Sequence, residues 1–459
     1  MSSIKTWLLL LVVVLMCATS PARACFFCSC GVSELHIDGS DEGSDEESVP
    51  SAYRTQGSGW GTTSSGYSGI GNPAILTWSI VPDGTTLPRG VSEPASDSNL
   101  IEFLDGLHHG GESPGGDDYT QRAWWGLMNS AFERWSQVAG LTFNYEPEDD
   151  GASMPTNRGV LGTRGDHRIG GHYIDGDVRP SNLAYNYFPS YSDMVIDTSE
   201  AGIFGNSEQN YLRFRNTLTH EIGHGLGLAH LESVDTTDDD DDHVFGTFLM
   251  EPTLSVNFDG PQFDDILGIQ RLYGDVYEKD GGNDTASTAT SLGALAFGAK
   301  LMIGTDADDQ YVAYTDVDFV SIDDNSDVDF FRFTIDAPMQ ISLLLEPKGP
   351  TYLEGAQGSA DNGRQDLLDT SALGDLSLAL LAMDGSTTIE LQNTFGLGLD
   401  EWIEEVTLTD PGEYFVRIGS TTNAAQMYQL SVISVPEPAS LAILSAGLLG
   451  IVRWRRRRA

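Results

Sequence analysis

The feature that most constrains this chain is the run HEIGHGLGLAH at residues 220–230. Residues four apart share one face of a helix, so His220 and His224 can present two imidazole nitrogens to the same metal ion. Gly227 can adopt the positive φ that ends a helix abruptly, which lets the chain bring His230 back as a third ligand. Three neutral imidazoles suit zinc and leave a fourth position open for water. The sequence therefore predicts one catalytic zinc ion at the end of a helix.

Glu221 directly follows the first histidine and is expected to reach that water. Zinc lowers the pKa of a bound water towards about 7, and a carboxylate can take its proton during attack on a carbonyl and pass it to the leaving amine. We therefore expect a secreted zinc-dependent endopeptidase. Two alternatives remain: an extracellular matrix or adhesion protein whose metalloprotease-like domain is not catalytic, and a zinc hydrolase of other amides or esters.

Residues 72–275, which contain this run, have the mixed pattern of an α+β domain. Apolar residues recur with the helical period in three segments, and three others are strand-like. The expected helices are 119–138, 209–226 and 263–273, and the expected strands are 75–80, 141–143 and 183–188.

A linker is predicted at residues 276–282, before a second domain of different character. Residues 283–434 contain short alternating strands separated by turn residues and no long helical pattern, which indicates an all-β sandwich that serves as an accessory domain. Its clearest expected strands are 330–335, 341–345, 376–381 and 414–418.

Both ends of the chain carry patterns typical of export. Residues 1–24 have the basic, apolar and small-residue regions of a signal peptide. Residues 25–71 are rich in Gly, Ser and acids and are expected to be a flexible leader. The tail, residues 435–459, combines Pro, an apolar run and an Arg-rich end, which predicts transient membrane contact, with a permanent anchor as the alternative.

The charge of the chain bears on its binding partners, and its few cysteines form an incomplete set. The chain has 24 Lys and Arg against 68 Asp and Glu, a net charge of −44, so nucleic acid is not expected as a partner. Cys25, Cys28 and Cys30 are an odd set after the apolar leader, and the sequence leaves their role open.

The run at residues 220–230 resembles the zinc-binding helix of metzincin metalloproteases, specifically of the matrixin branch. Met250, in the phrase FLMEP, matches the family's Met-turn, the hydrophobic floor beneath the zinc. The resemblance implies a twisted mixed sheet with an active-site helix over residues 72–275. It also implies that Leu183, Ala184 and Tyr185 form the edge strand along which an extended polypeptide substrate lies.

This chain departs from many animal matrixins at a second, structural zinc site. Tyr185 and Val195 stand where those proteins have histidines, so we expect a single zinc ion. Asp175, Asp197 and Glu200 remain at the corresponding acidic positions. These three residues are expected either to bind calcium, which prefers oxygen ligands, or to be solvated loop acids.

Two further resemblances concern the rest of the chain. Residues 283–434, with the phrases DVDFF and GEYFV, resemble the bacterial pre-peptidase C-terminal domain, which implies an accessory or binding module. Residues 435–459 resemble the PEP-CTERM sorting signal of Gram-negative bacteria that make exopolysaccharide. That resemblance implies processing by an exosortase-type enzyme, a secreted or cell-surface location, and exopolysaccharide or cell-surface matrix as a partner.

Overall fold

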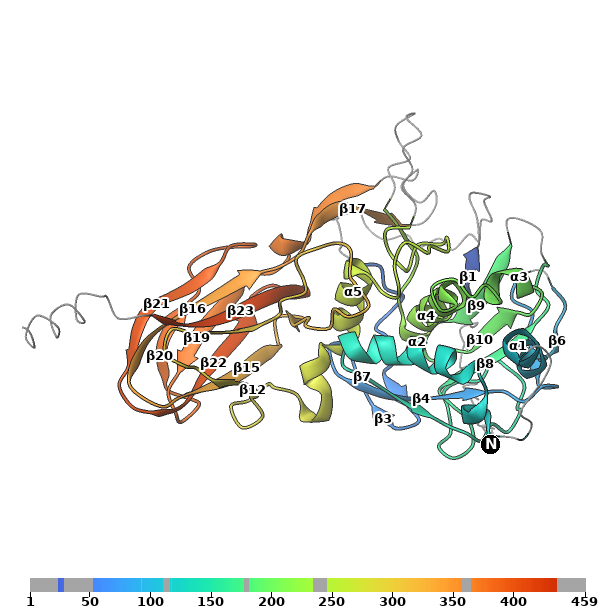
Figure 1. Cartoon of the computed structure of the whole chain (residues 1–459), viewed down its shortest axis with the longest axis horizontal. Coiled ribbons are helices and arrows are strands. Elements are labelled where there is room, and N and C mark those ends of the chain that lie inside the picture. The colour runs from blue at the N-terminus through green and yellow to red at the C-terminus, as the bar shows by residue number, and fades with distance from the viewer. Residues whose placement is uncertain are drawn as a thin grey trace, which may run out of the picture.

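The architecture is that of a mixed α/β unit joined to a β-sandwich, in a computed structural model (Figure 1). The structure describes residues 24–28, 53–91, 93–109, 116, 118–176, 181–233, 246–356 and 365–435. Most of the predicted signal peptide, residues 29–52 of the predicted leader and the sorting tail from residue 436 lie outside the described residues. Among the helices within those ranges, none combines the length and the apolar character needed to cross a membrane.

The N-terminal unit is built on a six-stranded mixed sheet with the order β1-β9-β10-β8-β4-β7. Strand β10 pairs in parallel with β8, as β4 does with β8 and β7, whereas β9 is antiparallel to both β1 and β10. The strands are β1 (Ala24–Cys28), β4 (Ala74–Ile80), β7 (Leu141–Tyr145), β8 (His167–His172), β9 (Asn182–Tyr187) and β10 (Met194–Asp197). Two short hairpins join β2 (Thr62–Thr63) to β3 (Gly66–Tyr67) and β5 (Thr86–Leu87) to β6 (Ser96–Asp97).

Helices follow the apolar period of the sequence. Seven residues of α2 are buried, including Trp135, which lies fully inside the core. The helix predicted over residues 119–138 begins only at Trp125 in the structure, because Asp118 caps a separate 3-10 turn before it. The helices are α1 (Leu100–His109), α2 (Trp125–Val138), α3 (Ala201–Phe204), α4 (Leu212–Leu226) and α5 (Phe263–Tyr273), with 3-10 turns η1 (Tyr119–Gln121), η2 (Val276–Gly281) and η4 (Thr370–Ala372).

The predicted flexible leader is wrong for residues 53–71, which pack against the N-terminal unit. Trp60 is fully buried, and its indole Nε1 donates a hydrogen bond to the carbonyl of Gly225 at the end of α4. Thr55 forms a β-bridge with Leu228, just before the third predicted zinc ligand. The richness in Gly and Ser suggested disorder, but one aromatic anchor and backbone pairing hold this segment in place.

The sandwich consists of two five-stranded sheets. One has the order β12-β15-β22-β19-β20, and the other has the order β13-β23-β16-β21, with β14 as a fifth strand paired to β23. Alternate residues of β15 are buried, as the sequence pattern predicts, and face a separate apolar core. The strands are β12 (Thr290–Ala294), β13 (Lys300–Ile303), β14 (Ser321–Ile322), β15 (Val328–Ile335), β16 (Met339–Pro347), β19 (Leu376–Leu381), β20 (Thr388–Gln392), β21 (Glu401–Leu408), β22 (Gly412–Ser420) and β23 (Gln426–Val435).

The two units are not joined by the predicted linker alone. A third sheet combines β11 (Leu231–Glu232) of the N-terminal unit with β17 (Thr351–Ala356) and β18 (Asp366–Asp369), a hairpin that projects from the sandwich (Figure 1). The apolar core around α2 and α4 includes several side chains from the C-terminal part of the chain, among them Phe319, Tyr352 and Met427. The sandwich therefore contributes to the core of the N-terminal unit.

Candidate metal centre

Helix α4 carries two of the predicted zinc ligands on one buried face. His220, Glu221 and His224 are all fully buried. The helix ends at Gly227, whose φ of 111° lies in the left-handed region that a side chain disfavours. The chain turns there and returns His230 to the same side, as the spacing in the sequence predicts.

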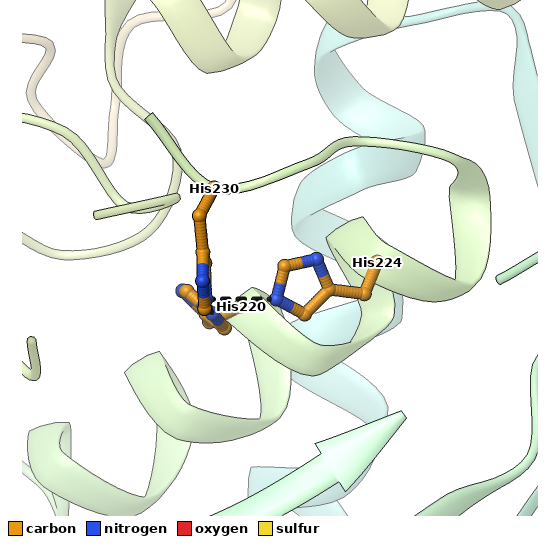
Figure 2. Close-up of side chains that lie close together, drawn as sticks. All are labelled: His220, His224 and His230. Atoms are coloured by element: carbon orange, nitrogen blue, oxygen red, sulfur yellow. Dashed lines mark hydrogen bonds between the residues drawn. The ribbon is translucent and has the colours of Figure 1, made fainter. Parts of the chain in front are cut away.

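The three imidazoles converge on one point (Figure 2). The Nε2 atom of His230 lies 3.1 Å from Nε2 of His220 and 3.1 Å from Nε2 of His224. Two nitrogens bound at about 2.05 Å to a tetrahedral ion would lie about 3.3 Å apart, so the arrangement fits zinc with little adjustment.

The other ring nitrogens of the helical pair are held by backbone carbonyls. Nδ1 of His220 donates to the carbonyl of Leu249 at 2.6 Å, and Nδ1 of His224 donates to that of Leu228 at 2.7 Å. These bonds place the ring proton on Nδ1, so each Nε2 atom carries the lone pair that a metal ion would accept. Burial, together with the neighbouring imidazoles, lowers the pKa of both rings well below the ordinary histidine value, which favours the neutral form that binds metal.

Glu221 has the environment of a group that requires a polar partner. Both carboxylate oxygens are buried and have no hydrogen-bond partner within the described part of the chain. Burial raises the pKa of this carboxyl well above its ordinary value, and a nearby cation would act in the opposite direction. The side-chain amide of Asn186 in β9 donates to the backbone carbonyl of Glu221 and ties the helix to the sheet. An orphaned buried carboxylate on the helix that carries two of the three converging imidazoles fits a site for a metal ion and a water molecule.

Met250 lies beneath the site and is almost fully buried. A Cβ atom added at Gly223 would lie only 2.6 Å from the Met250 sulfur, so the missing side chain at Gly223 permits this close packing. The Asp265 carboxylate in α5 accepts hydrogen bonds from the backbone N–H groups of Leu249 and Met250. Nothing in the sequence signals this contact.

The proposed substrate strand β9 does not lie at the edge of the sheet in this structure. Residues 24–28 form β1, which pairs antiparallel with β9 and sets Phe26 opposite Tyr185 and Phe27 opposite Ala184. Leu183, Ala184 and Tyr185 are buried. A peptide that pairs with β9 on this side must therefore take the place of β1.

The acidic residues proposed for calcium lie together. Asp175, Asp197 and Glu200 each offer a carboxylate oxygen, and these atoms lie within 4.8 Å of one another. Asp197 also accepts hydrogen bonds from the backbone N–H groups of Ile174 and Ser199, which fix its orientation. Three oxygen donors at this separation suit a hard cation.

A second acidic cluster, which sequence reasoning missed, lies where the two units join. Carboxylate oxygens of Glu278, Asp327 and Asp329 lie within 4.8 Å of one another. Asp329 is fully buried and one of its oxygens has no hydrogen-bond partner within the described ranges. The phrase Asp327-Val328-Asp329 is visible in the sequence, but only the fold brings it to the predicted linker.

A family comparison supports the same kind of site. The family model described as Matrixin matches residues 116–274, so this part of the chain is similar to matrixins. The model of the PEP-CTERM protein-sorting motif matches residues 434–458. The resemblances to matrixins and to the PEP-CTERM signal are thereby confirmed.

Similar curated proteins include matrix metalloproteinases, collagenases and a bacterial metallopeptidase. The chain is 29% identical over 164 residues to matrix metalloproteinase-16 of Rattus norvegicus, which covers 35% of this chain and 24% of that protein. It is 31% identical over 151 residues to interstitial collagenase of Bos taurus, covering 32% and 27%. It is 27% identical over 184 residues to metallopeptidase AprA of Pseudomonas marginalis, covering 36% of each. The chain thus spans only about a quarter to a third of the length of these relatives.

The similar solved structures include the pre-peptidase C-terminal domain of a collagenase from Bacillus anthracis. It covers 31% of this chain and 93% of its own, with 13% identity and a TM-score of 0.17. A likeness of that size carries no argument about the sandwich.

Proposed function

We propose that this protein is a zinc-dependent endopeptidase. The observation that carries the proposal is the convergence of three imidazole nitrogens, separated by 3.1 Å across two pairs. The Glu221 carboxylate, on the same helix as two of them, is buried and has no hydrogen-bond partner among the described residues. The matrixin domain over residues 116–274 supports the same activity.

The histidines and Glu221 have different roles in the proposed reaction. A zinc ion bound to His220, His224 and His230 supplies electrophilic activation of a carbonyl and makes water more acidic. The bonds from the His220 and His224 Nδ1 atoms to carbonyls orient both rings. The water molecule attacks the peptide carbonyl. Glu221 takes a proton from this water during the attack and delivers that proton to the leaving amine.

The substrate is proposed to be an extended polypeptide that pairs with β9. The support is the antiparallel pairing of residues 24–28 with this strand, since it is the geometry that an added peptide strand would use. Leu183, Ala184 and Tyr185 would supply the backbone partners. Occupation by residues 24–28 and by substrate would then be mutually exclusive.

Calcium at Asp175, Asp197 and Glu200 is proposed as a structural ion. The support is a set of three carboxylates with oxygens within 4.8 Å of one another. Like charges this close repel one another, and a divalent cation relieves that repulsion.

The location is proposed to be outside the cell, at the surface or in a surrounding matrix. The sorting motif at residues 434–458 supports export in a Gram-negative bacterium and processing by an exosortase-type enzyme. Exopolysaccharide or cell-surface matrix is the proposed partner after processing. This location also suits the alternative function, an adhesion protein that does not cleave peptides.

A variant of Glu221 tests catalysis directly. Glu221→Gln should lower kcat on an unfolded polypeptide by about 10²- to 10⁴-fold because it removes the proton carrier. It should still bind one zinc ion, because the three imidazoles are untouched. Glu133→Gln, the same change on the exposed face of α2, is the control and should match wild type. Wild-type activity in Glu221→Gln would overturn the proposed role of Glu221. A zinc-loaded wild type that digests no peptide would favour the adhesion protein.

A further inference from the structure

The strand that follows the third histidine is paired with the sandwich. His230 immediately precedes β11, and β11 pairs antiparallel with β17, with Leu231 opposite Ala356 and Glu232 opposite Gly355. The Leu231 N–H also donates to the carbonyl of Met250 at 3.3 Å. The backbone beside His230 is therefore held between the Met-turn and a hairpin from the other unit.

Tyr352 in β17 contacts the elements that support the site. Its hydroxyl donates to the Asp264 carboxylate at 2.5 Å, and its ring packs on Phe248 with the centroids 4.8 Å apart. Asp264 is followed by Asp265, whose carboxylate holds the backbone of Met250. Tyr352 is only 4% exposed, so this contact lies inside the core shared by the two units.

Glu354 in the same strand supplies a second link. It is buried and accepts a hydrogen bond from Nε of Arg54 at 2.7 Å. The backbone carbonyl of Arg54 accepts one from the N–H of Ala229 at 2.9 Å, one residue before His230. Arg54 therefore connects the sandwich hairpin to the chain that carries the third ligand.

We propose that the hairpin β17–β18 is a positioning element of the metal centre, through which the sandwich sets the affinity and geometry of the zinc site. This inference rests on the proposed zinc-binding function. It gives the sandwich a role beyond the accessory binding module that the sequence suggests, because Tyr352 and Glu354 act on the backbone around His230 and Met250. They are positioning residues and touch neither substrate nor metal.

The physical reason lies in the difference between the three ligands. His220 and His224 are fixed by a helix, whereas His230 lies in a connection after the helix end and depends on what packs against it. Groups that orient metal ligands from outside commonly change metal affinity by 10- to 100-fold when removed.

The test uses the full chain with Tyr352→Phe and Glu354→Gln. Arg271→Gln is the matched control, because Arg271 also bridges the two units, to the Asp323 carbonyl and the Asn423 side chain, without touching the hairpin. The measurements are the zinc dissociation constant by competition with a chelator, and the visible spectrum of the protein loaded with cobalt(II). Arg54→Gln tests the Glu354 link from the N-terminal unit if a hairpin variant does not fold.

We expect Tyr352→Phe, Glu354→Gln and Arg54→Gln each to weaken zinc binding by about tenfold and to alter the cobalt spectrum. Arg271→Gln should stay within about twofold of wild type even where its thermal stability falls. Wild-type zinc affinity and an unchanged spectrum in the hairpin variants would overturn the inference. Because affinity is measured without a substrate, a wild type that binds zinc but cleaves nothing overturns the proposed activity alone.

Discussion

The Asp265 carboxylate accepts a hydrogen bond from the backbone N–H of Met250 at 3.0 Å. Its other oxygen accepts from the N–H groups of Leu249 and Gln262, each at 2.8 Å. The first turn of α5 therefore holds the Met-turn, and the carbonyl of Leu249 in that turn orients His220. One buried side chain connects the helix start to a predicted metal ligand.

Asp265→Asn should destabilise the protein and weaken zinc binding. An amide has one acceptor oxygen where the carboxylate has two, so at least one buried N–H loses its partner, at a cost of about 1–3 kcal/mol. Thermal unfolding with and without zinc measures the loss of stability, and chelator competition measures the affinity. Asp336→Asn, an exposed change of the same kind in the sandwich, is the control. A variant that matches wild type in both measurements would show that Asp265 does not support the site.

Gly223→Ala should show direct coupling between the zinc helix and Met250. The added Cβ atom would lie 2.6 Å from the Met250 sulfur and 3.2 Å from the Trp135 ring. Overpacking of this kind costs about 1–3 kcal/mol. The double variant with Met250→Ala should lose less stability than the sum of the single changes, as measured by thermal unfolding.

The control for this pair is Gly126→Ala in α2, where an added Cβ meets no atom within 4 Å. Alanine suits a helix better than glycine, so stability should rise by about 0.5–1 kcal/mol. Strictly additive effects at Gly223 and Met250 would contradict the coupling.

Substitutions at Trp60 test, through their effect on stability, whether the residues before 72 belong to the folded domain. Trp60→Ala should cost about 3–5 kcal/mol because a fully buried aromatic ring is removed. Trp60→Phe should cost less but lose the hydrogen bond to Gly225. Tyr67→Ala, at a side chain that is 87% exposed, should be nearly neutral. Calorimetry distinguishes these outcomes, and equal stability of all three variants would restore the view of a flexible leader.

Buried carboxyl groups where the two units join, Glu278 and Asp323, predict that the protein becomes less stable as the pH rises. The measurement is made in the presence of a chelator, so that no metal ion is bound. Burial and neighbouring carboxylates raise the pKa of Glu278 to about 9 and that of Asp323 to about 8. In the unfolded chain both groups lose their protons near pH 4. Between these values the folded chain binds more protons than the unfolded chain, so its free energy of unfolding decreases with rising pH. The unfolding temperature should therefore drop between pH 5 and pH 9.

Glu278→Gln should flatten this pH dependence, because the amide does not ionise. Glu404→Gln, an exposed change in β21, is the control for net charge and should leave the slope unchanged. The explanation fails if the slope of Glu278→Gln equals that of wild type. The groups around Glu278 that contribute to the effect are Asp275, Asp284, Asp323 and Asp327.

Local patterns in the sequence were sufficient for the three longest helices and for seven of the strands. The apolar period over 263–273 predicted α5 with the bounds that the structure has, and strand 376–381 was likewise predicted in full. Helix α4 begins at Leu212, slightly later than the expected start near residue 209, because Gln209, Asn210 and Tyr211 all have positive φ. Such errors fall at element ends, where periodicity gives the least information.

The sequence by itself determined the pairing of two imidazoles at the centre, because the spacing of His220 and His224 needs only a helix to bring both rings onto one face. Only the tertiary structure decided what surrounds it: the burial of Trp60, the contact of Asp265 with Met250 and the pairing of β11 with β17. The physical reason is the separation along the chain of the residues that interact. Helical spacing depends on neighbours in the chain, whereas these contacts join segments more than ten residues apart and exist only after the chain has folded.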